Sequence, residues 1–468
     1  MTRADLVVVA NRLPVDRDDD GGWRQSPGGL VAALEPVMRR ADGAWVGWPG
    51  RPDTTVDEFD FEGTHLVPVT LSRQEVAEYY EGFSNDTIWP LYHDVISPPQ
   101  YRREWWNTYV EVNRRFADAA VAVAAKGATI WVQDYQLQLV PKLIRERRPD
   151  VTIGYFHHIP FPAYGLFSQL PWRRQVVEGL LGADVIGFQR AADASNFARA
   201  VHRQLRYETR ATGIRIPNED GSVRVSLAKA FPISIDAASF VELAHRDDIR
   251  ARAREIRADL GNPDKILLGV DRLDYTKGIR HRMTAFGELL SENRLSVDRA
   301  TLVQVASPSR ERVEAYVQLR DEIELAVGRI NGTFDTMEHT AIRYLHQAFP
   351  REEMVALYLA ADVMLVTALR DGMNLVAKEY VASRIDNRGA LVLSEFTGAA
   401  DELGSAIRVN PHDIEGLKEA IMRGVEMPSA EQGRRMRALR RRVREHDVQA
   451  WSHDFLAALE RARKANAS

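Results

Sequence analysis

Short apolar runs alternate along the chain with longer segments in which apolar residues recur at helical spacing. This alternation is typical of parallel α/β architecture, because buried parallel strands are apolar on both faces and amphipathic helices connect them. The segment 128–162 has the pattern strand, helix, strand, and such a crossover makes its two strands parallel and adjacent. Strands are predicted at residues 5–12, 128–134, 151–162, 183–190, 265–272, 300–310, 361–367 and 390–396.

The chain is expected to fold as more than one domain, because 468 residues exceed the usual size of a single compact core. Within residues 229–240 a strand-like run meets Pro232 and a polar turn, and each half on either side has the length of a Rossmann-like domain. We therefore predict an N-terminal domain over residues 1–236 and a C-terminal domain over 237–446, followed by a last segment, 447–468.

Polar side chains follow the carboxyl ends of the predicted strands, which is where ligands bind in open α/β sheets. The segment ALRDGMNLVAKEY, residues 368–380, is the densest example. A helix that begins near Asn374 would direct free backbone N–H groups and the positive end of its dipole toward an anion. A site is therefore expected at these strand ends, which carry Arg12, Asp134, His157, His158, Gln189, Arg190, Arg272, Arg310, Arg370, Asp371, Asn374, Lys378 and Glu379.

Composition removes several classes of function. The chain has no cysteine, which excludes disulfides, thiolate metal sites and cysteine nucleophiles and fits a cytoplasmic protein. Its 62 Lys and Arg against 66 Asp and Glu give a formal charge of -4, so no overall field attracts nucleic acid. The apolar run at residues 6–10 is too short for a signal peptide, and no window is long and apolar enough for a membrane span.

The arginine-rich segment 433–447 is the one stretch that suggests binding to nucleic acid or a membrane. Met436, Leu439 and Val443 recur there at helical spacing, so we predict an amphipathic helix whose arginines face solvent. The expected partners are therefore small-molecule substrates, with no nucleic acid and no membrane, and a homo-oligomer is expected.

Two hydrolytic or metal-dependent chemistries are compatible with polar groups at strand ends. Hydrolysis by two carboxylates would use Asp134 with Glu379 or Asp371. A metal-dependent transferase would need a strand-end Asp-x-Asp motif, and the only candidate, residues 18–20, lies in a polar loop typical of a solvated turn. No metal ligands are predicted.

A third chemistry uses cations without a metal. Arg272 and Lys277 lie together in VDRLDYTKG, Arg12 accompanies the glycine turn SPGGL, and a helix N-terminus is expected near Asn374. Arginine, lysine and helix N–H donors neutralise the charge of a departing diphosphate. This set favours a metal-independent nucleotide-sugar transferase.

Six stretches carry a family resemblance: VVVANRLPV, SPGGLVAALEP, IWVQDYQLQLVPKLIR, YFHHIPFP, VDRLDYTKGI and RDGMNLVAKEYV. Together they resemble the trehalose-6-phosphate synthases, retaining glycosyltransferases of the GT-B fold, from about residue 5 to about residue 455. The resemblance implies an α/β protein with two Rossmann-like parallel-sheet domains facing a central cleft. It also implies that residues 447–468 form a helix crossing back to the N-terminal domain, with Trp451, Phe455 and Leu456 as its anchors.

The same resemblance implies transfer of glucose from a nucleotide-glucose donor, UDP- or ADP-glucose, to glucose 6-phosphate, with no cofactor. The acceptor site falls on Arg12, Tyr80, Trp89, Asp134 and Arg310, of which Arg12, Tyr80 and Arg310 would hold the phosphate. The donor site falls on Gly28, Gly29, Arg272, Lys277, Phe349, Asp371, Gly372, Met373, Asn374, Leu375, Val376 and Glu379.

The residues with implied catalytic roles are Asp134, His158, Arg272, Lys277 and Asp371. His158 would contact the donor sugar near the reacting carbon, Asp371 its hydroxyls, and Glu379 the ribose. Arg272 and Lys277 would bear the charge of the leaving phosphate, which itself takes the acceptor's proton in a front-face transfer. No residue has the pattern of a committed nucleophile.

Two alternatives stay open. A catalytically silent homologue that senses sugar phosphates would be expected to lack Arg272, Lys277, Asp371 or Glu379, and all four are present. A synthase of the same family with glycerol 3-phosphate or a cyclitol phosphate as acceptor would differ in loops that the pattern does not define. The base of the donor is undetermined, because backbone groups near Phe349 would hold it in part.

Overall fold

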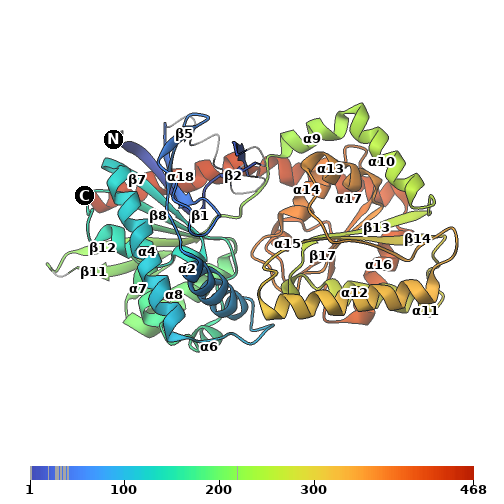
Figure 1. Ribbon diagram of the computed structural model, residues 1–468, viewed down its shortest axis with the longest axis horizontal. Coiled ribbons are helices and arrows are strands. Elements are labelled where there is room, and N and C mark those ends of the chain that lie inside the picture. The colour runs from blue at the N-terminus through green and yellow to red at the C-terminus, as the bar shows by residue number, and fades with distance from the viewer. Residues whose placement is uncertain are drawn as a thin grey trace. The chain divides into compact units, whose positions relative to one another are not determined.

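The computed structural model describes residues 3–18, 21–26, 31, 34, 38, 42–218 and 220–467. The chain forms two compact units (Figure 1). Unit 1 consists of Met1–Ile233 with Gln449–Ser468, and unit 2 consists of Ser234–Val448. The boundaries predicted after residues 236 and 446 lie close to these divisions.

Unit 1 is built on a sheet with the strand order β10-β11-β12-β9-β8-β7-β1-β4-β6-β5. The strands from β12 to β6 pair in parallel, and antiparallel strands close both edges. The sheet's strands are β1 (Ala4–Arg12), β4 (Ala44–Trp48), β5 (Phe59–Phe61), β6 (Thr64–Pro68), β7 (Ala124–Gln133), β8 (Thr152–His157), β9 (Val185–Phe188), β10 (Glu208–Arg210), β11 (Gly213–Pro217) and β12 (Val223–Ala230). Strands β2 (Val15–Arg17) and β3 (Trp23–Gln25) form a separate hairpin.

Helices connect the parallel strands of unit 1 and pack on the sheet. They are α2 (Arg73–Glu75), the π-helix η1 (Val76–Ile88), α3 (Trp89–Tyr92), α4 (Arg103–Val123), the short 3-10 helix η2 (Tyr135–Leu137), α5 (Val140–Arg145), α6 (Tyr164–Phe167), α7 (Arg173–Leu180) and α8 (Ala191–Leu205). The last helix, α18 (Val448–Ala467), belongs to unit 1 from its second residue onward.

Helix α18 packs on the middle of the unit 1 sheet. The ring of Phe455 stacks on Trp131 of β7 with centroids 4.5 Å apart, and the indole N–H of Trp451 donates to the carbonyl of Phe231 at 3.1 Å. A side chain at Gly187 would come within 2.7 Å of the Phe455 ring, so glycine leaves the room that this helix fills. Leu456 was predicted as an anchor and is only half-buried, because Leu459, one turn after Phe455, faces the sheet instead.

Unit 2 is built on a parallel sheet with the strand order β15-β14-β13-β16-β17-β18. Its strands are β13 (Lys265–Arg272), β14 (Ala300–Ser307), β15 (Ile342–Leu345), β16 (Val363–Val366), β17 (Ala390–Ser394) and β18 (Ile407–Val409). Its helices are α9 (Ala237–His245), α10 (Asp247–Asp259), the 3-10 helix η3 (Tyr275–Lys277), α11 (Ile279–Ser291), α12 (Glu314–Phe334), α13 (Arg351–Ala360), α14 (Leu375–Ser383), α15 (Ala399–Glu402), α16 (Ile414–Glu426) and α17 (Ser429–Glu445).

The eight predicted strands are all confirmed, as β1, β7, β8, β9, β13, β14, β16 and β17. Strands β7 and β8 pair in parallel, as the crossover over residues 128–162 predicts. In both units the parallel strands place their carboxyl ends along one edge of the sheet, so the side chains that follow neighbouring strands lie near one another.

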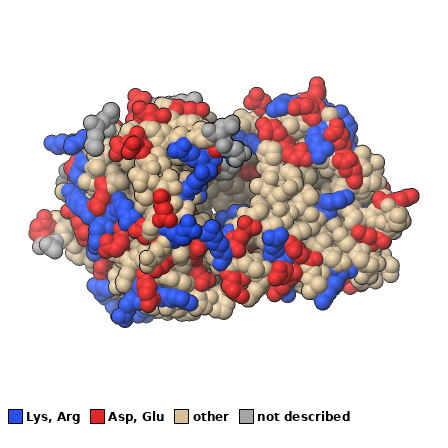
Figure 2. All heavy atoms as spheres, in the orientation of Figure 1, with Lys and Arg blue, Asp and Glu red and all other residues tan. Residues whose placement is uncertain are grey.

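The surface carries both signs of charge. Lysine and arginine are interspersed with aspartate and glutamate over the visible face of each unit (Figure 2), in keeping with the formal charge of -4. Helix α17 buries Met436, Leu439 and Val443, which confirms the predicted amphipathic helix. Within the part of the chain that the structure describes, every helix is too short or too polar to cross a membrane.

Candidate active site

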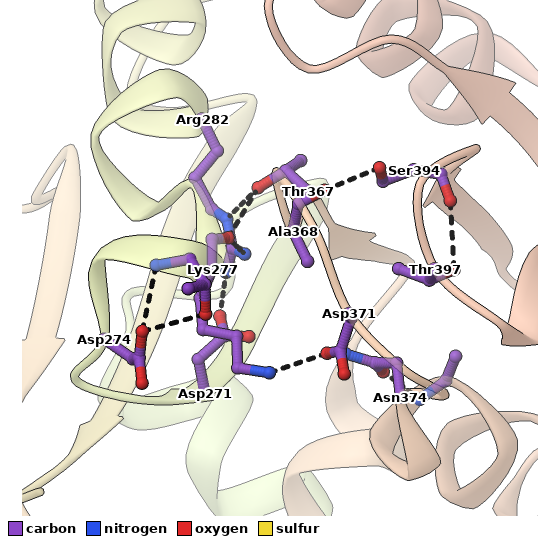
Figure 3. Close-up of polar contacts among 12 residues, drawn as sticks. Asp271, Asp274, Lys277, Arg282, Thr367, Ala368, Asp371, Asn374, Ser394 and Thr397 are labelled. Atoms are coloured by element: carbon purple, nitrogen blue, oxygen red, sulfur yellow. Dashed lines mark hydrogen bonds and ion pairs between the residues drawn. The ribbon is translucent and has the colours of Figure 1, made fainter. Parts of the chain in front are cut away.

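An ion pair joins two loops at the carboxyl edge of the unit 2 sheet. Lys277 follows β13 and Asp371 follows β16, and the Lys277 ammonium donates to Asp371 Oδ2 at 2.6 Å (Figure 3). The two side chains are only 11% and 14% exposed, so the pair is far less screened by water than a surface ion pair. The structure thus brings together two residues 94 positions apart for which the family resemblance implies a place in the donor site.

The turn that carries Lys277 is held close to the end of β16. Gly278 has a φ of +64°, and a side chain there would collide with the carbonyl oxygen of Thr367, so both the conformation and the space require glycine. The backbone N–H of Leu369 donates to the carbonyl of Thr276 at 2.7 Å. The two loops therefore form one rigid edge.

A fully buried arginine lies beneath this edge. Arg282, on α11, has a side chain that is 0% exposed, and it forms an ion pair with Asp271 of β13 at 2.8 Å. It also donates to the Thr367 hydroxyl at 2.9 Å and to the Lys277 carbonyl at 3.3 Å, so one guanidinium connects both loops (Figure 3). Arg282 did not emerge from the sequence, although it lies at core-facing spacing on its helix, three residues after Ile279 and four before Phe286.

Helix α14 begins where the sequence predicted a helix N-terminus. Its N-cap is Asn374, whose side-chain oxygen accepts from the Ala377 N–H at 3.0 Å and whose amide donates to Asp371 Oδ2 at 3.3 Å. One turn into the helix, Glu379 accepts from the Tyr358 hydroxyl at 2.8 Å. Burial raises the pKa of the Glu379 carboxyl, while the Tyr358 hydrogen bond acts in the opposite direction.

The remaining donor-site predictions lie around the same edge. Arg272 is the last residue of β13 and is exposed, Phe349 is half-buried just before α13, and Gly372 and Met373 are buried. Leu375 and Val376 form the half-buried first turn of α14. Gly28 and Gly29, also predicted to bind the donor, lie outside the described residues.

In unit 1, two side chains predicted for the acceptor site, Arg12 and Tyr80, lie near Trp48 at the ends of β1 and β4. The guanidinium of Arg12 lies over the Trp48 ring, 5.2 Å from its centroid, and pairs with Asp16 at 2.8 Å. The ring of Tyr80, from η1, lies 6.3 Å from Trp48. Arg12 and Tyr80 thus both lie near Trp48, and their binding of an acceptor phosphate stays a prediction.

A second group in unit 1 forms at the ends of β7 and β8. Asp134 has a φ of +72°, and its Oδ1 accepts from the backbone N–H of Tyr135 at 2.9 Å and of His158 at 3.1 Å. The His158 ring bonds to the side-chain oxygen of Gln133 at 2.9 Å. Trp89 packs on the Tyr135 ring at 5.7 Å, so Asp134, His158 and Trp89 share one small region.

The two adjacent histidines differ in role. His157, the last residue of β8, is 0% exposed and bonds to the Tyr155 hydroxyl at 3.0 Å, whereas His158 keeps part of its surface accessible. Burial lowers the pKa of each to about 3, with charge repulsion from His158 adding to the effect on His157. His158 is therefore uncharged at neutral pH and can offer a hydrogen bond but no positive charge.

The lowered pKa of His157 predicts a loss of stability in acid. In the unfolded chain a histidine takes up a proton below about pH 6.5, whereas folded His157 does so only near 3, so the unfolded state binds more protons in that window. The free energy of unfolding should fall by about 2 kcal/mol per such histidine between about pH 7.5 and about pH 5. Denaturant titrations at these pH values should show a smaller fall for His157→Phe than for the wild type, and equal falls would contradict the assignment.

Three side chains that contact the predicted site residues or the loops that carry them were missed by the sequence reasoning. Trp48 ends the apolar run AWVGW, so its position at a strand end was a usable signal. Tyr358 lies on a helix and had no local signal, whereas the helical spacing of Arg282 relative to Ile279 and Phe286 was a usable one. Among the described residues, no group of three or more His, Asp or Glu side chains is arranged to hold a metal ion, and the candidate at residues 18–20 lies partly outside them.

The two parallel-sheet units match the architecture of solved glycosyltransferases of the GT-B fold, and the family model shows that the chain is a glycosyltransferase of this class. The chain belongs to glycosyltransferase family 20, whose model matches residues 4–461.

The similarity to named relatives and to solved structures covers nearly the whole chain. The chain is 58% identical over 468 residues to the trehalose-6-phosphate synthase of Mycobacterium avium, covering 97% of this chain and 95% of that one. An α,α-trehalose-phosphate synthase (UDP-forming) of Burkholderia xenovorans, solved in complex with glucose-6-phosphate, is 34% identical with a TM-score of 0.89, covering 97% and 99%. An E. coli protein bound with UDP-2-fluoro glucose is 32% identical with a TM-score of 0.88, covering 97% and 98%.

Proposed function

We propose that this chain transfers glucose, with retention of configuration, from a nucleotide-glucose donor to glucose 6-phosphate and so forms trehalose 6-phosphate. The observation that carries the proposal is the largely enclosed Lys277–Asp371 pair at the carboxyl edge of the unit 2 sheet, with the half-buried Glu379 on the helix that follows Asp371. The named relatives support it, since one was solved with glucose-6-phosphate and another with UDP-2-fluoro glucose.

The donor would occupy the edge of unit 2. Asp371 would accept hydrogen bonds from the glucose hydroxyls, and Glu379 from the ribose hydroxyls, because carboxylates are acceptors for such pairs of O–H groups. The backbone N–H groups at the start of α14 would face the phosphate. Lys277 and Arg272 would bear the charge that grows on the diphosphate as the glycosidic bond breaks.

The acceptor would occupy the strand ends of unit 1. Arg12 with Tyr80 would hold its phosphate, and Asp134 with Trp89 would hold the sugar ring. The role of His158 would be a hydrogen bond to the donor sugar, since a neutral imidazole both donates and accepts. The departing phosphate would take the proton of the acceptor hydroxyl, so that no protein nucleophile is required.

The reaction should proceed without added metal or cofactor, because Lys277, Arg272 and the α14 N-terminus supply the positive charge that the leaving group needs. The test is to incubate the pure protein with glucose 6-phosphate and UDP-, ADP- or GDP-glucose, with and without EDTA, and to measure nucleoside diphosphate release. We expect release with at least one donor and no loss in EDTA. Activity that EDTA abolishes and only a divalent ion restores would contradict the metal-free route.

A synthase of the same family could carry out the same transfer with a different phosphorylated acceptor. Glycerol 3-phosphate and a cyclitol phosphate should be tested in the same assay, and a higher kcat/KM with either would replace glucose 6-phosphate in the proposal. A cytoplasmic location and a homo-oligomer complete the proposal, and light scattering of the pure protein tests the second.

A further inference from the structure

Arg310 stands in an unusual backbone position at the carboxyl end of β14. Its φ is +50°, in the left-handed region that side chains other than glycine and asparagine rarely adopt. Its side chain is only 5% exposed, although it carries a charge. The surrounding structure must therefore hold Arg310 in this conformation. Two neighbouring side chains, Tyr316 and Asp274, contact its guanidinium.

Tyr316 and Asp274 share one nitrogen of Arg310. Asp274 caps the short helix η3, and Tyr316 lies in the first turn of α12. The Tyr316 hydroxyl donates to Asp274 Oδ2 at 2.9 Å and accepts from Arg310 Nη1, which also lies 3.3 Å from Asp274 Oδ2. The three polar groups therefore form a closed triangle within unit 2.

The carboxylate in this triangle is permanently charged at neutral pH. Asp274 is 0% exposed, and burial alone would raise its pKa, but Arg310, Arg272 and Lys277 outweigh that effect and lower the pKa to about 2. It also accepts from the backbone N–H and the hydroxyl of Thr276, at 2.9 and 2.8 Å. Arg310 is thus tied to the same turn that carries Lys277.

The hydroxyl of Tyr316 keeps the arginine and the aspartate apart. Their 3.3 Å separation exceeds the roughly 2.7–2.9 Å of a direct charge-assisted hydrogen bond. Without the hydroxyl, the guanidinium would close onto the buried carboxylate, and this tighter pair would offer less charge to an external anion. The ring of Tyr316 also packs on Tyr275 at 5.3 Å, and phenylalanine would preserve that contact.

We propose that Tyr316 is a positioning residue for acceptor selectivity: its hydroxyl holds Arg310 so that the guanidinium engages the phosphate of a phosphorylated acceptor. The inference rests on the proposed function and on the family resemblance, which implies that Arg310 contacts the phosphate of the acceptor. In this proposal Tyr316 acts through Arg310, which its hydroxyl contacts, so its effect should be visible only with acceptors that carry a phosphate.

The test compares Tyr316→Phe with the wild type on glucose 6-phosphate and on glucose. The ratio of kcat/KM for glucose 6-phosphate to kcat/KM for glucose should fall about tenfold or more, as expected for a lost hydrogen bond to a charged group. The KM for the nucleotide-glucose donor and the rate with glucose should stay unchanged. The matched control is Tyr344→Phe on β15, whose hydroxyl has no hydrogen-bond partner among the described residues and whose loss should leave the ratio unchanged.

A double-mutant cycle separates positioning from a general structural effect. In an Arg310→Ala background, adding Tyr316→Phe should cause no further fall in the ratio, whereas a further fall of the same size would overturn the proposal. An unchanged ratio in Tyr316→Phe alone would also overturn it. Failure of the proposed function is a different result: wild-type protein that transfers no glucose to glucose 6-phosphate, or Arg310→Ala that keeps the wild-type ratio, would remove the basis for assigning Arg310.

Discussion

Lys277→Ala should lower kcat by about two to three orders of magnitude while changing the affinity for the nucleotide-glucose donor far less. The Lys277 ammonium lies 2.6 Å from Asp371 in a region with little exposure to water, where a charge interaction is stronger than at the surface. Charge on the diphosphate grows as the bond to glucose breaks, so a cation at this place stabilises the transition state more than the bound donor. Steady-state rates and donor binding by calorimetry measure the two effects separately.

The matched control for this prediction lies on the same strand. Lys265 is the first residue of β13, at the amino edge of the sheet, whereas Lys277 follows its carboxyl edge. Lys265→Ala should leave kcat and donor affinity unchanged. If Lys277→Ala weakened donor binding and turnover equally, Lys277 would act in ground-state binding and the charge argument would be wrong.

Arg282→Met should lower the free energy of unfolding by about 3–5 kcal/mol, the usual effect of removing one partner from a buried ion pair. Arg282 is 0% exposed and Asp271 3%, so the substitution leaves a carboxylate enclosed in protein without its cation. The hydrogen bonds to Thr367 and to the Lys277 carbonyl disappear with it. Urea unfolding followed by fluorescence, together with residual activity, measures the loss.

Two further variants sharpen the prediction about Arg282. The control Arg280→Met removes a neighbouring arginine of the same helix, which forms an ion pair with Glu322 at 2.6 Å. The side chains of Arg280 and Glu322 are 60% and 52% exposed, and surface ion pairs of this kind contribute about 0–1 kcal/mol to stability. The double variant Arg282→Met with Asp271→Asn should recover part of the lost stability, because no unpaired charge stays buried. Equal losses for Arg280→Met and Arg282→Met would contradict this account.

The long buried strands could be predicted from sequence because they are apolar over most of their length. Strands β13, β14, β16 and β17 are examples, and they form the middle of the unit 2 sheet. The strands missed are short or at sheet edges, such as β15 (Ile342–Leu345) and β18 (Ile407–Val409), where few residues are buried on both faces and the pattern is weak. The π-helix η1 could not be predicted, since no residue pattern separates it from an α-helix.

Part of the candidate site could also be predicted, because the ends of the predicted strands mark where polar side chains gather. Position at a strand end is visible in sequence and indicated Arg12, Asp134 and Arg310. What sequence could not show is which distant side chains meet. Arg280 and Arg282 stand two residues apart on one helix, and only packing against β13 buries the second beside Asp271.

The return of the chain to unit 1 through α18 has a consequence for biosynthesis. Phe455 covers Trp131 and Phe156, yet the ribosome makes it 299 residues after Phe156. At the usual 5–20 residues per second, that face of the sheet stays uncovered for roughly 15–60 s. All of unit 2 is synthesised within this interval, so the second unit can finish folding before the first.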